Sequence, residues 1–241
     1  MNIHILISFK ILVIEQLRES LTLFWNLLAP VIVFAALNHE AILNRQTLPI
    51  DALYPYLSYT VLSMALYSFG IVLLNRREEG FFVSVTHTRI SFIRFIALQW
   101  LAIYTIFLFA ISVLMIIFSM FLTPIPPQTA LLLLLYVTVS FSVTSLLFVG
   151  LGCLPINQKS AYSAASFIIM IALMMFMFSK SIDPAELSVN LMMLLNPLLL
   201  SYFLLLEGVF NSSVFIISFI YICLGSYSLM TFPKQPVFKR A

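Results

Sequence analysis

Long apolar runs dominate this chain, and polar residues gather in the short segments between them. A helix needs roughly 20 apolar residues to cross a bilayer, because lipid offers no hydrogen-bond partner to an exposed backbone. Six runs are long enough, at about 21–37, 52–74, 99–122, 130–151, 161–178 and 213–231. A seventh, over 191–206, is shorter and is interrupted by Asn196-Pro197. The pattern predicts one all-α integral membrane domain over 1–241 with six transmembrane helices.

Charge placement indicates whether the seventh run also crosses. If the N-terminus is cytoplasmic and the seventh run does not cross, ten of the twelve Lys and Arg residues face the cytoplasm. If the seventh run crosses, the split becomes seven to five. Because cytoplasmic segments of membrane proteins carry the excess of Lys and Arg, six spans are favoured, in the cell membrane with both termini cytoplasmic.

The segment over 184–208 is then expected to form a re-entrant helical hairpin on the outer side, between spans five and six. Pro184 can occupy the first position of a helix. Asn196-Pro197 divides the apolar run, and Glu207 stands at its end. The alternative is a badly formed seventh span, which the charge distribution disfavours.

Residues 2–20 precede the first span and are typical of an amphipathic helix. Most polar side chains here fall on one arc of a helical wheel, about 100° wide, with apolar residues around the rest. We expect this helix to lie along the cytoplasmic interface. A plain N-terminal extension of span one is the alternative.

The composition agrees with this pattern and excludes several classes of function. Of the 241 residues, 62% are apolar or aromatic and 9% are charged, with a mean hydropathy of +1.10. Soluble domains carry about 25% charged residues. A soluble enzyme, a nucleic-acid-binding protein and a disordered chain are therefore excluded. Two cysteines far apart in sequence imply neither a disulfide framework nor a metal site.

Catalytic and nucleotide-binding motifs are missing from the sequence. His39-Glu40 begins a zinc-protease pattern, but Leu43 stands where the second His is required. There is no G-x-S-x-G elbow, no G-x-x-x-x-G-K-[ST] phosphate-binding motif and no pair of carboxylates within the spans. We therefore expect no catalytic residues, no cofactor and no metal on this chain.

The loop over 75–94 is the strongest candidate for an interaction site. Four charged residues end the second span, a glycine permits a sharp turn, and two aromatic residues follow. A short helix over 81–86 fits this order, with its aromatic side chains pressed into lipid or into a groove on a partner. An ordinary positive-inside loop with interfacial aromatics is the alternative. The candidate contact residues are Arg76, Arg77, Glu78, Glu79, Gly80, Phe81 and Phe82.

Hydroxyl-bearing residues recur within two spans and form a second candidate site. Small polar residues in membrane helices serve packing more often than transport, so packing is the alternative to a pathway. The candidate pathway residues are Tyr59, Ser63 and Tyr67 in span two and Thr138, Ser142 and Ser145 in span four.

These features, in this order, resemble the permease subunit of type 2 ABC exporters, a family that includes multidrug, bacteriocin and polysaccharide exporters. Phe81 departs from the family pattern, which has Thr or Ser there, and the Ser-Gly usual at the outer end of span five is missing. The matching features are an interfacial N-terminal helix, Pro30 near the middle of span one, Arg77-Glu78-Glu79-Gly80 after span two, and Asn196-Pro197 between spans five and six.

The resemblance implies a pump assembled from several chains. Two permease subunits, the same or related chains, would pair in the lipid bilayer, and each would engage a separate ABC ATPase that binds ATP and Mg²⁺. The loop over 80–88 and the N-terminal helix would dock on that ATPase. The uncharged spans suit a hydrophobic or amphipathic substrate, such as a drug, a bacteriocin-like peptide or a lipid-like molecule.

Two other functions stay open on the sequence. An ion-gradient-driven transporter usually buries ionisable residues near mid-membrane, and the span centres here carry almost none. A non-transporting immunity or scaffold protein would not need the loop over 76–88.

Overall fold

The computed structural model describes residues 3–18, 20–44, 47–86, 92–121, 123–179, 187–208 and 211–233. Every regular element in these ranges is a helix. The long elements are α2 (Ser20–Leu37), α4 (Tyr54–Ser63) with η2 (Met64–Ile71) and α5 (Val72–Glu78), α7 (Phe92–Ser119), α8 (Pro127–Phe148) with η3 (Val149–Cys153), α9 (Gln158–Ser179) and α12 (Ser212–Thr231). The short elements are α1 (Ile3–Arg18), α3 (His39–Leu43), η1 (Ile50–Leu53), α6 (Phe81–Thr86), α10 (Leu187–Leu195) and α11 (Pro197–Glu207).

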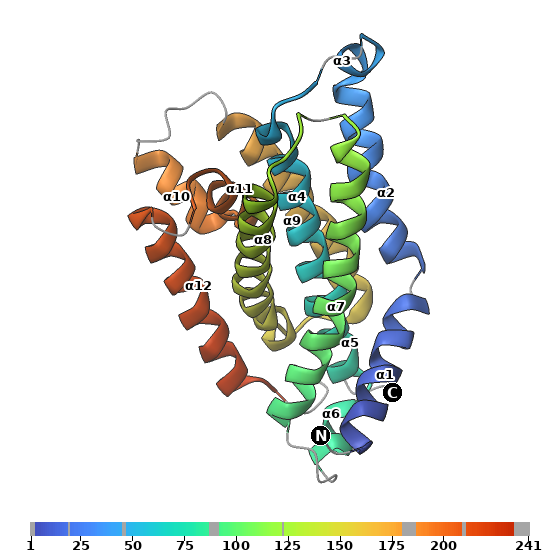
Figure 1. Cartoon of the computed structure of the whole chain (residues 1–241). Coiled ribbons are helices and arrows are strands. Elements are labelled where there is room, and N and C mark those ends of the chain that lie inside the picture. Colours follow the sequence, from blue (N-terminus) through green and yellow to red (C-terminus); the bar gives the residue numbers. More distant parts are fainter. Residues whose placement is uncertain are drawn as a thin grey trace.

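Five helical segments of the described chain are long and apolar enough to cross a membrane, which confirms the prediction of an all-α, multi-pass membrane protein. In Figure 1 they stand side by side with α2. Helices α1 and α6 lie at one end of this bundle, here called the α6 end, and α3 lies at the other, the α3 end. The five segments are Ile50–Glu78, Phe92–Ser119, Pro127–Cys153, Lys159–Phe178 and Ser212–Thr231.

Two helices extend beyond the apolar runs that predicted them. Helix α5 continues through Arg76 and Arg77 to Glu78, and α7 begins at Phe92, seven residues before the apolar run at 99. A helix satisfies its own backbone hydrogen bonds, so it can continue past the apolar stretch as long as its polar side chains find partners or water. Apolar runs therefore underestimate helix length at the α6 end.

The rod of α4, η2 and α5 forms the centre of the bundle, and most of its residues are buried. Its middle part, Met64–Ile71, is a π-helix, a form that is rare and found mostly as a local widening of α-helices. A Cβ atom built on Gly70 would lie 3.0 Å from Leu151 Cδ1 and 3.1 Å from Phe148 Cβ. The glycine thus lets the central rod approach the junction of α8 and η3 closely.

Helices α10 and α11 are too short to cross a bilayer. They contain 9 and 11 residues, or about 14 and 17 Å at 1.5 Å per residue, against about 30 Å of hydrocarbon. Between them, Asn196 accepts a hydrogen bond from the Leu198 amide (3.0 Å) and donates one to the Ala172 carbonyl of α9 (2.8 Å). The break predicted at Asn196-Pro197 is therefore a helix start that is also tied to a neighbouring span. Pro184, predicted to begin the hairpin, lies outside the described residues.

Candidate functional site

The junction between α5 and α6 is built around a tight turn. Gly80 has a φ of +73°, in the left-handed region that favours glycine. Its amide donates to the Arg77 carbonyl at 2.9 Å, and the Glu79 amide donates to the Asn75 carbonyl at 2.9 Å. Helix α6 follows directly and covers Phe81–Thr86, the residues at which the sequence predicted a short helix. The part of the predicted loop that the structure describes is thus a sharp corner between two helices, α5 and α6, at the α6 end.

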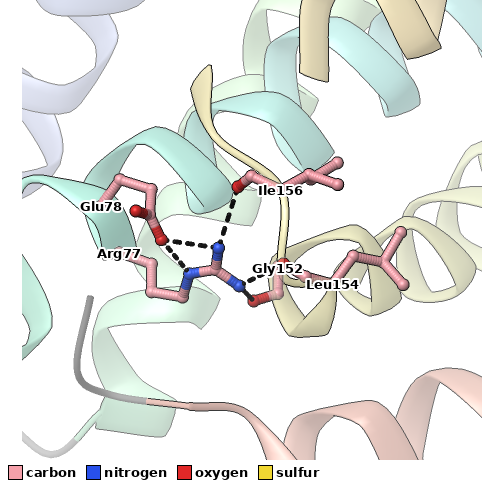
Figure 2. A network of polar contacts seen from close by, with 5 residues as sticks. All are labelled: Arg77, Glu78, Gly152, Leu154 and Ile156. Atoms are coloured by element: carbon pink, nitrogen blue, oxygen red, sulfur yellow. Dashed lines mark hydrogen bonds and ion pairs between the residues drawn. The ribbon is translucent and has the colours of Figure 1, made fainter. Parts of the chain in front are cut away.

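Arg77 is completely buried, and its guanidinium is saturated by partners from this chain. Nη1 donates to the carbonyls of Gly152 (2.6 Å) and Leu154 (2.7 Å), and Nη2 donates to that of Ile156 (3.3 Å). Nε donates to Glu78 at 2.9 Å, and Nη2 lies 2.6 Å from the same carboxylate oxygen. Figure 2 shows the guanidinium between Glu78 and the segment that follows η3. Arg77 therefore ties the end of α5 to the turn between α8 and α9, rather than facing a partner chain.

Arg76 ties the same corner to two other elements. Its Nη2 lies 2.6 Å from the Glu15 carboxylate of α1. Its guanidinium also lies over the rings of Phe81 and Phe95, 5.0 and 5.1 Å from their centroids, within the range of a cation–π interaction. The two consecutive arginines thus connect α5 to α1, α6, α7 and the α8–α9 turn.

Phe82 is buried inside the chain, although the sequence analysis placed it against lipid or a partner. Its ring lies 5.2 Å from Phe92 and 5.2 Å from Phe232, which follows α12, and 5.9 Å from Phe95. Phe81 is partly buried beside it. The earlier interpretation was wrong for Phe82 because its covering rings come from the next long helix, α7, and from Phe232, which lies 150 residues further along the chain.

Glu79 is the candidate contact that stays exposed, with Gly80 and Phe81 partly exposed beside it. Glu78 is mostly buried against Arg77, with 11% of its side chain exposed. The corner therefore presents a small outer surface at Glu79, Gly80 and α6. The rest of the predicted contact set serves to hold this surface on the bundle.

Two of the three predicted pathway residues of span four contact α7. Trp100 Nε1 donates to Ser145 Oγ at 2.8 Å, and the hydroxyls of Tyr104 and Thr138 lie 3.4 Å apart. Ser142 donates to the Thr138 carbonyl of its own helix at 2.8 Å. Thr138 and Ser145 therefore contribute to helix packing, which is the alternative given in the sequence analysis.

The three predicted pathway residues of span two lie in three different environments. Ser63 is buried and donates to the carbonyl of Thr60 at 3.2 Å. Tyr67, in the π-helix, shares a 3.1 Å hydrogen bond with Ser166 of α9. Tyr59 lines a cavity. Of the six candidate pathway residues, Tyr59 is the one that meets this cavity.

The cavity lies in the half of the bundle nearer the α3 end and has a volume of about 390 Å³. Its walls come from α2, α4, α9 and the start of α11, which are separated by up to 170 residues of sequence. They are apolar or aromatic, and the polar groups among them are tyrosine hydroxyls. The residues that define its shape are Pro30, Val33, Tyr56, Tyr59, Phe176 and Met177.

One carboxylate closely precedes the wall of this cavity in the sequence. Asp51 of η1 is exposed and lies four residues before Pro55, which lines the cavity. Burial raises the pKa of the Tyr202 phenol in α11, and the Asp51 carboxylate raises it further. The ring of Tyr202 lies 5.1 Å from that of Phe176, which lines the cavity.

Sequence reasoning missed the walls supplied by α2 and α9. Their apolar residues have the same composition as lipid-facing residues, so no signal in the sequence distinguishes them. The four-residue spacing of Asp51, Pro55 and Tyr59 is the one pattern that could have suggested a shared face.

Comparison with known proteins identifies no relative: no family model, curated protein or solved structure matches this chain. Within the described ranges, no group of three His, Cys, Asp or Glu side chains is placed to hold a metal ion. The corner at the α6 end and the cavity nearer the α3 end are therefore the features from which a function can be argued.

Proposed function

We propose that this chain is the transmembrane permease subunit of an ATP-driven exporter of the type 2 ABC kind. It would move a hydrophobic or amphipathic substrate, such as a drug, a peptide or a lipid-like molecule, out of the cytoplasm. ATP and Mg²⁺ would bind to separate ATPase subunits. The observation that carries the proposal is the α5–α6 corner, which has exposed side chains at Glu79 and Val83 and which two arginines tie to the rest of the bundle.

Such a corner could transmit a movement of a bound partner protein to the helices of the bundle. A partner changes a conformational equilibrium only through contacts that differ in free energy between the two states. The exposed side chains of Glu79 and Val83 could make such contacts. Arg77 then connects the corner to the α8–α9 turn, and α9 supplies Phe176 and Met177 to the cavity wall. Movement of α6 would in this way reach the cavity through hydrogen-bonded and covalent links.

The distribution of charge supports six spans with both termini in the cytoplasm. In this arrangement α2 is the sixth crossing helix, and α10 and α11 form the outer re-entrant pair. The described Lys and Arg residues all belong to helices or helix ends at the α6 end. The positive-inside rule makes this end cytoplasmic. These residues are Lys10, Arg18, Arg76, Arg77, Arg94 and Lys159.

We expect the exposed face of α9 to contact a second permease subunit. Phe167, Met174 and Met177 on this helix are all more than half exposed. Methionine side chains adapt to irregular neighbours. A second copy, or a related chain, would cover this face and close the cavity beside it from lipid.

Affinity purification from native membranes tests the class of protein. We expect a P-loop ATPase to co-purify in stoichiometric amount with the wild-type chain and with Glu40→Ala, which removes an exposed carboxylate at the α3 end as a matched control. The double variant Glu79→Ala, Gly80→Pro should insert normally but lose the ATPase and transport, because proline cannot adopt the φ of +73° at this turn. Unchanged transport with unchanged ATPase stimulation in the double variant would contradict the proposal.

The two other functions make different predictions. A gradient-driven transporter would move substrate without an ATPase and would be sensitive to uncouplers; the described spans carry their charged residues at the helix ends, which disfavours it. An immunity or scaffold protein would still protect cells after deletion of residues 76–88.

A further inference from the structure

We propose that the cavity between α2, α4, α9 and α11 binds a compact molecule with an apolar or aromatic body and a hydrogen-bond acceptor, such as a carbonyl or ether oxygen, and that the Tyr59 hydroxyl donates to this oxygen. The inference rests on the proposed function in treating the ligand as the transported substrate. The binding step itself needs no ATPase.

The size of the cavity limits the body of the ligand. Its volume of about 390 Å³ lies within the range of about 300–1,000 Å³ that is typical of small-molecule sites. Because an apolar protein cavity of about 150 Å³ holds one benzene molecule, this cavity has room for about two or three rings. A phospholipid, with two acyl chains and a headgroup, is much larger. The volume therefore favours a small molecule over a whole lipid.

The cavity has a closed floor and an open mouth. Pro30 of α2, Phe176 of α9 and Leu198 of α11 line it and are buried. Val33 and Met177 also line it, but they are 47% and 67% exposed. The mouth therefore lies at the outside of the chain between α2 and α9, where a ligand dissolved in the membrane can enter. Burial of the ligand against the apolar walls would provide most of the binding free energy.

One hydroxyl of this wall has an unused hydrogen-bond donor. Across the described part of the chain, the Tyr59 hydroxyl makes no hydrogen bond. It is also absent from the described polar atoms that are both fully buried and unpartnered, so it is accessible on a side chain that lines the cavity. A hydroxyl that is kept from water without an acceptor costs free energy, which a hydrogen bond would recover. A ligand that brings an acceptor oxygen into the cavity supplies this bond.

Tyr56 offers a second donor in the same wall. Asn38 Nδ2 donates to the Tyr56 hydroxyl at 3.3 Å, so this hydroxyl accepts in that bond and keeps its own proton for another acceptor. Tyr56 and Tyr59 are three residues apart on α4 and are therefore neighbours on one face of the helix. A site with unpaired donors discriminates against a molecule that has no acceptor, because the donors then stay unpaired.

Two probes of the same size test this inference. Benzophenone has two rings joined by a carbonyl, and diphenylmethane has the same two rings without the oxygen. Saturable binding of each labelled probe is measured on the full chain in detergent micelles, without an ATPase, by competition with unlabelled probe. We expect benzophenone to bind more tightly than diphenylmethane. Tyr59→Phe removes one oxygen atom and should weaken benzophenone binding about three- to tenfold, as expected for one neutral hydrogen bond, while diphenylmethane binds as before.

Matched variants and a photochemical readout locate the site. Tyr227→Phe makes the same change on α12, which supplies no described residue to the wall, and should leave the binding of both probes unchanged. Leu173→Trp places a large ring in the wall and should abolish the binding of both probes in a chain that still folds. Irradiation attaches bound benzophenone to nearby side chains, so mass spectrometry should find the adducts on wall residues such as Met177.

Several outcomes would overturn the inference: no saturable benzophenone binding to the wild type, a Tyr59→Phe variant that binds benzophenone as the wild type does, adducts confined to α8 or α12, or complete displacement of benzophenone by a short-chain phosphatidylcholine, which would make the cavity a lipid site. These outcomes are independent of the proposed function. A chain that binds benzophenone through Tyr59 but recruits no ATPase would refute the pump alone. A chain that recruits an ATPase but binds no benzophenone would refute the cavity site alone.

Discussion

Replacing Arg77 by methionine tests the tie between α5 and the α8–α9 turn. Methionine keeps most of the side-chain length but removes every donor. The change would free the carbonyls of Gly152, Leu154 and Ile156 and leave the mostly buried Glu78 carboxylate without its guanidinium. We therefore expect a large loss of stability that begins at this turn.

The magnitude follows from burial. The arginine side chain is fully buried, and removal of one partner from a buried ion pair costs about 3–5 kcal/mol. Hydrogen bonds to a charged group contribute about 1.5–3 kcal/mol each, but Leu154 is exposed, so water can reach part of the freed backbone. We expect Arg77→Met to lower the free energy of unfolding by about 3–5 kcal/mol. Arg77→Lys should lose less, since an ammonium reaches some of these oxygens but cannot fork between them.

Arg76→Met provides the matched control, with the same change at the next residue. Its partner Glu15 has 52% of its side chain exposed, so this ion pair contributes little, about 0–1 kcal/mol. Loss of the two aromatic contacts adds about 0.5–1 kcal/mol each. We expect a total cost of about 1–3 kcal/mol for Arg76→Met.

Unfolding in mixed micelles measures both costs, and amide hydrogen exchange locates them. Arg77→Met should raise exchange first at the amides of residues 152–158, whereas Arg76→Met should raise it in α1 and α6. The reasoning would be refuted by an Arg77→Met variant that loses less than Arg76→Met, or by one whose 152–158 amides stay as protected as in the wild type.

Three further predictions use the same unfolding measurement. Asn196→Ala removes both the cap of α11 and the bond to α9 and should cost about 2 kcal/mol; an α11 that keeps its protection would contradict this. Gly152→Ala places a methyl group 2.7 Å from Phe232 Cζ and should cost about 1–3 kcal/mol, with a smaller loss when Phe232→Leu is combined with it. Gly208→Ala combines a φ of +77° and a ψ of −178° with a methyl group 2.8 Å from the Tyr136 hydroxyl and should cost about 2–3 kcal/mol, against about 1 kcal/mol for Gly80→Ala, which meets open space; equal costs would show that both the backbone and Tyr136 relax at Gly208.

Local sequence features predicted the main helices and their breaks. Apolar runs specified the long helices because any bilayer-crossing segment must satisfy its backbone bonds internally. Gly80 placed the turn before α6, and Asn196-Pro197 placed the start of α11, because both effects depend on the conformational preferences of one or two residues. These features could be read without knowledge of any neighbour.

The tertiary structure alone decided which side chains meet. It buried Arg77 against carbonyls some 75 to 79 residues away, covered Phe82 with rings from α7 and from the end of α12, and turned Thr138 and Ser145 toward α7. In a membrane the apolar side chains that face lipid and those that face protein are chemically alike. The sequence therefore determined that these helices form, while long-range packing determined their neighbours, and with them the corner at the α6 end and the cavity nearer the α3 end.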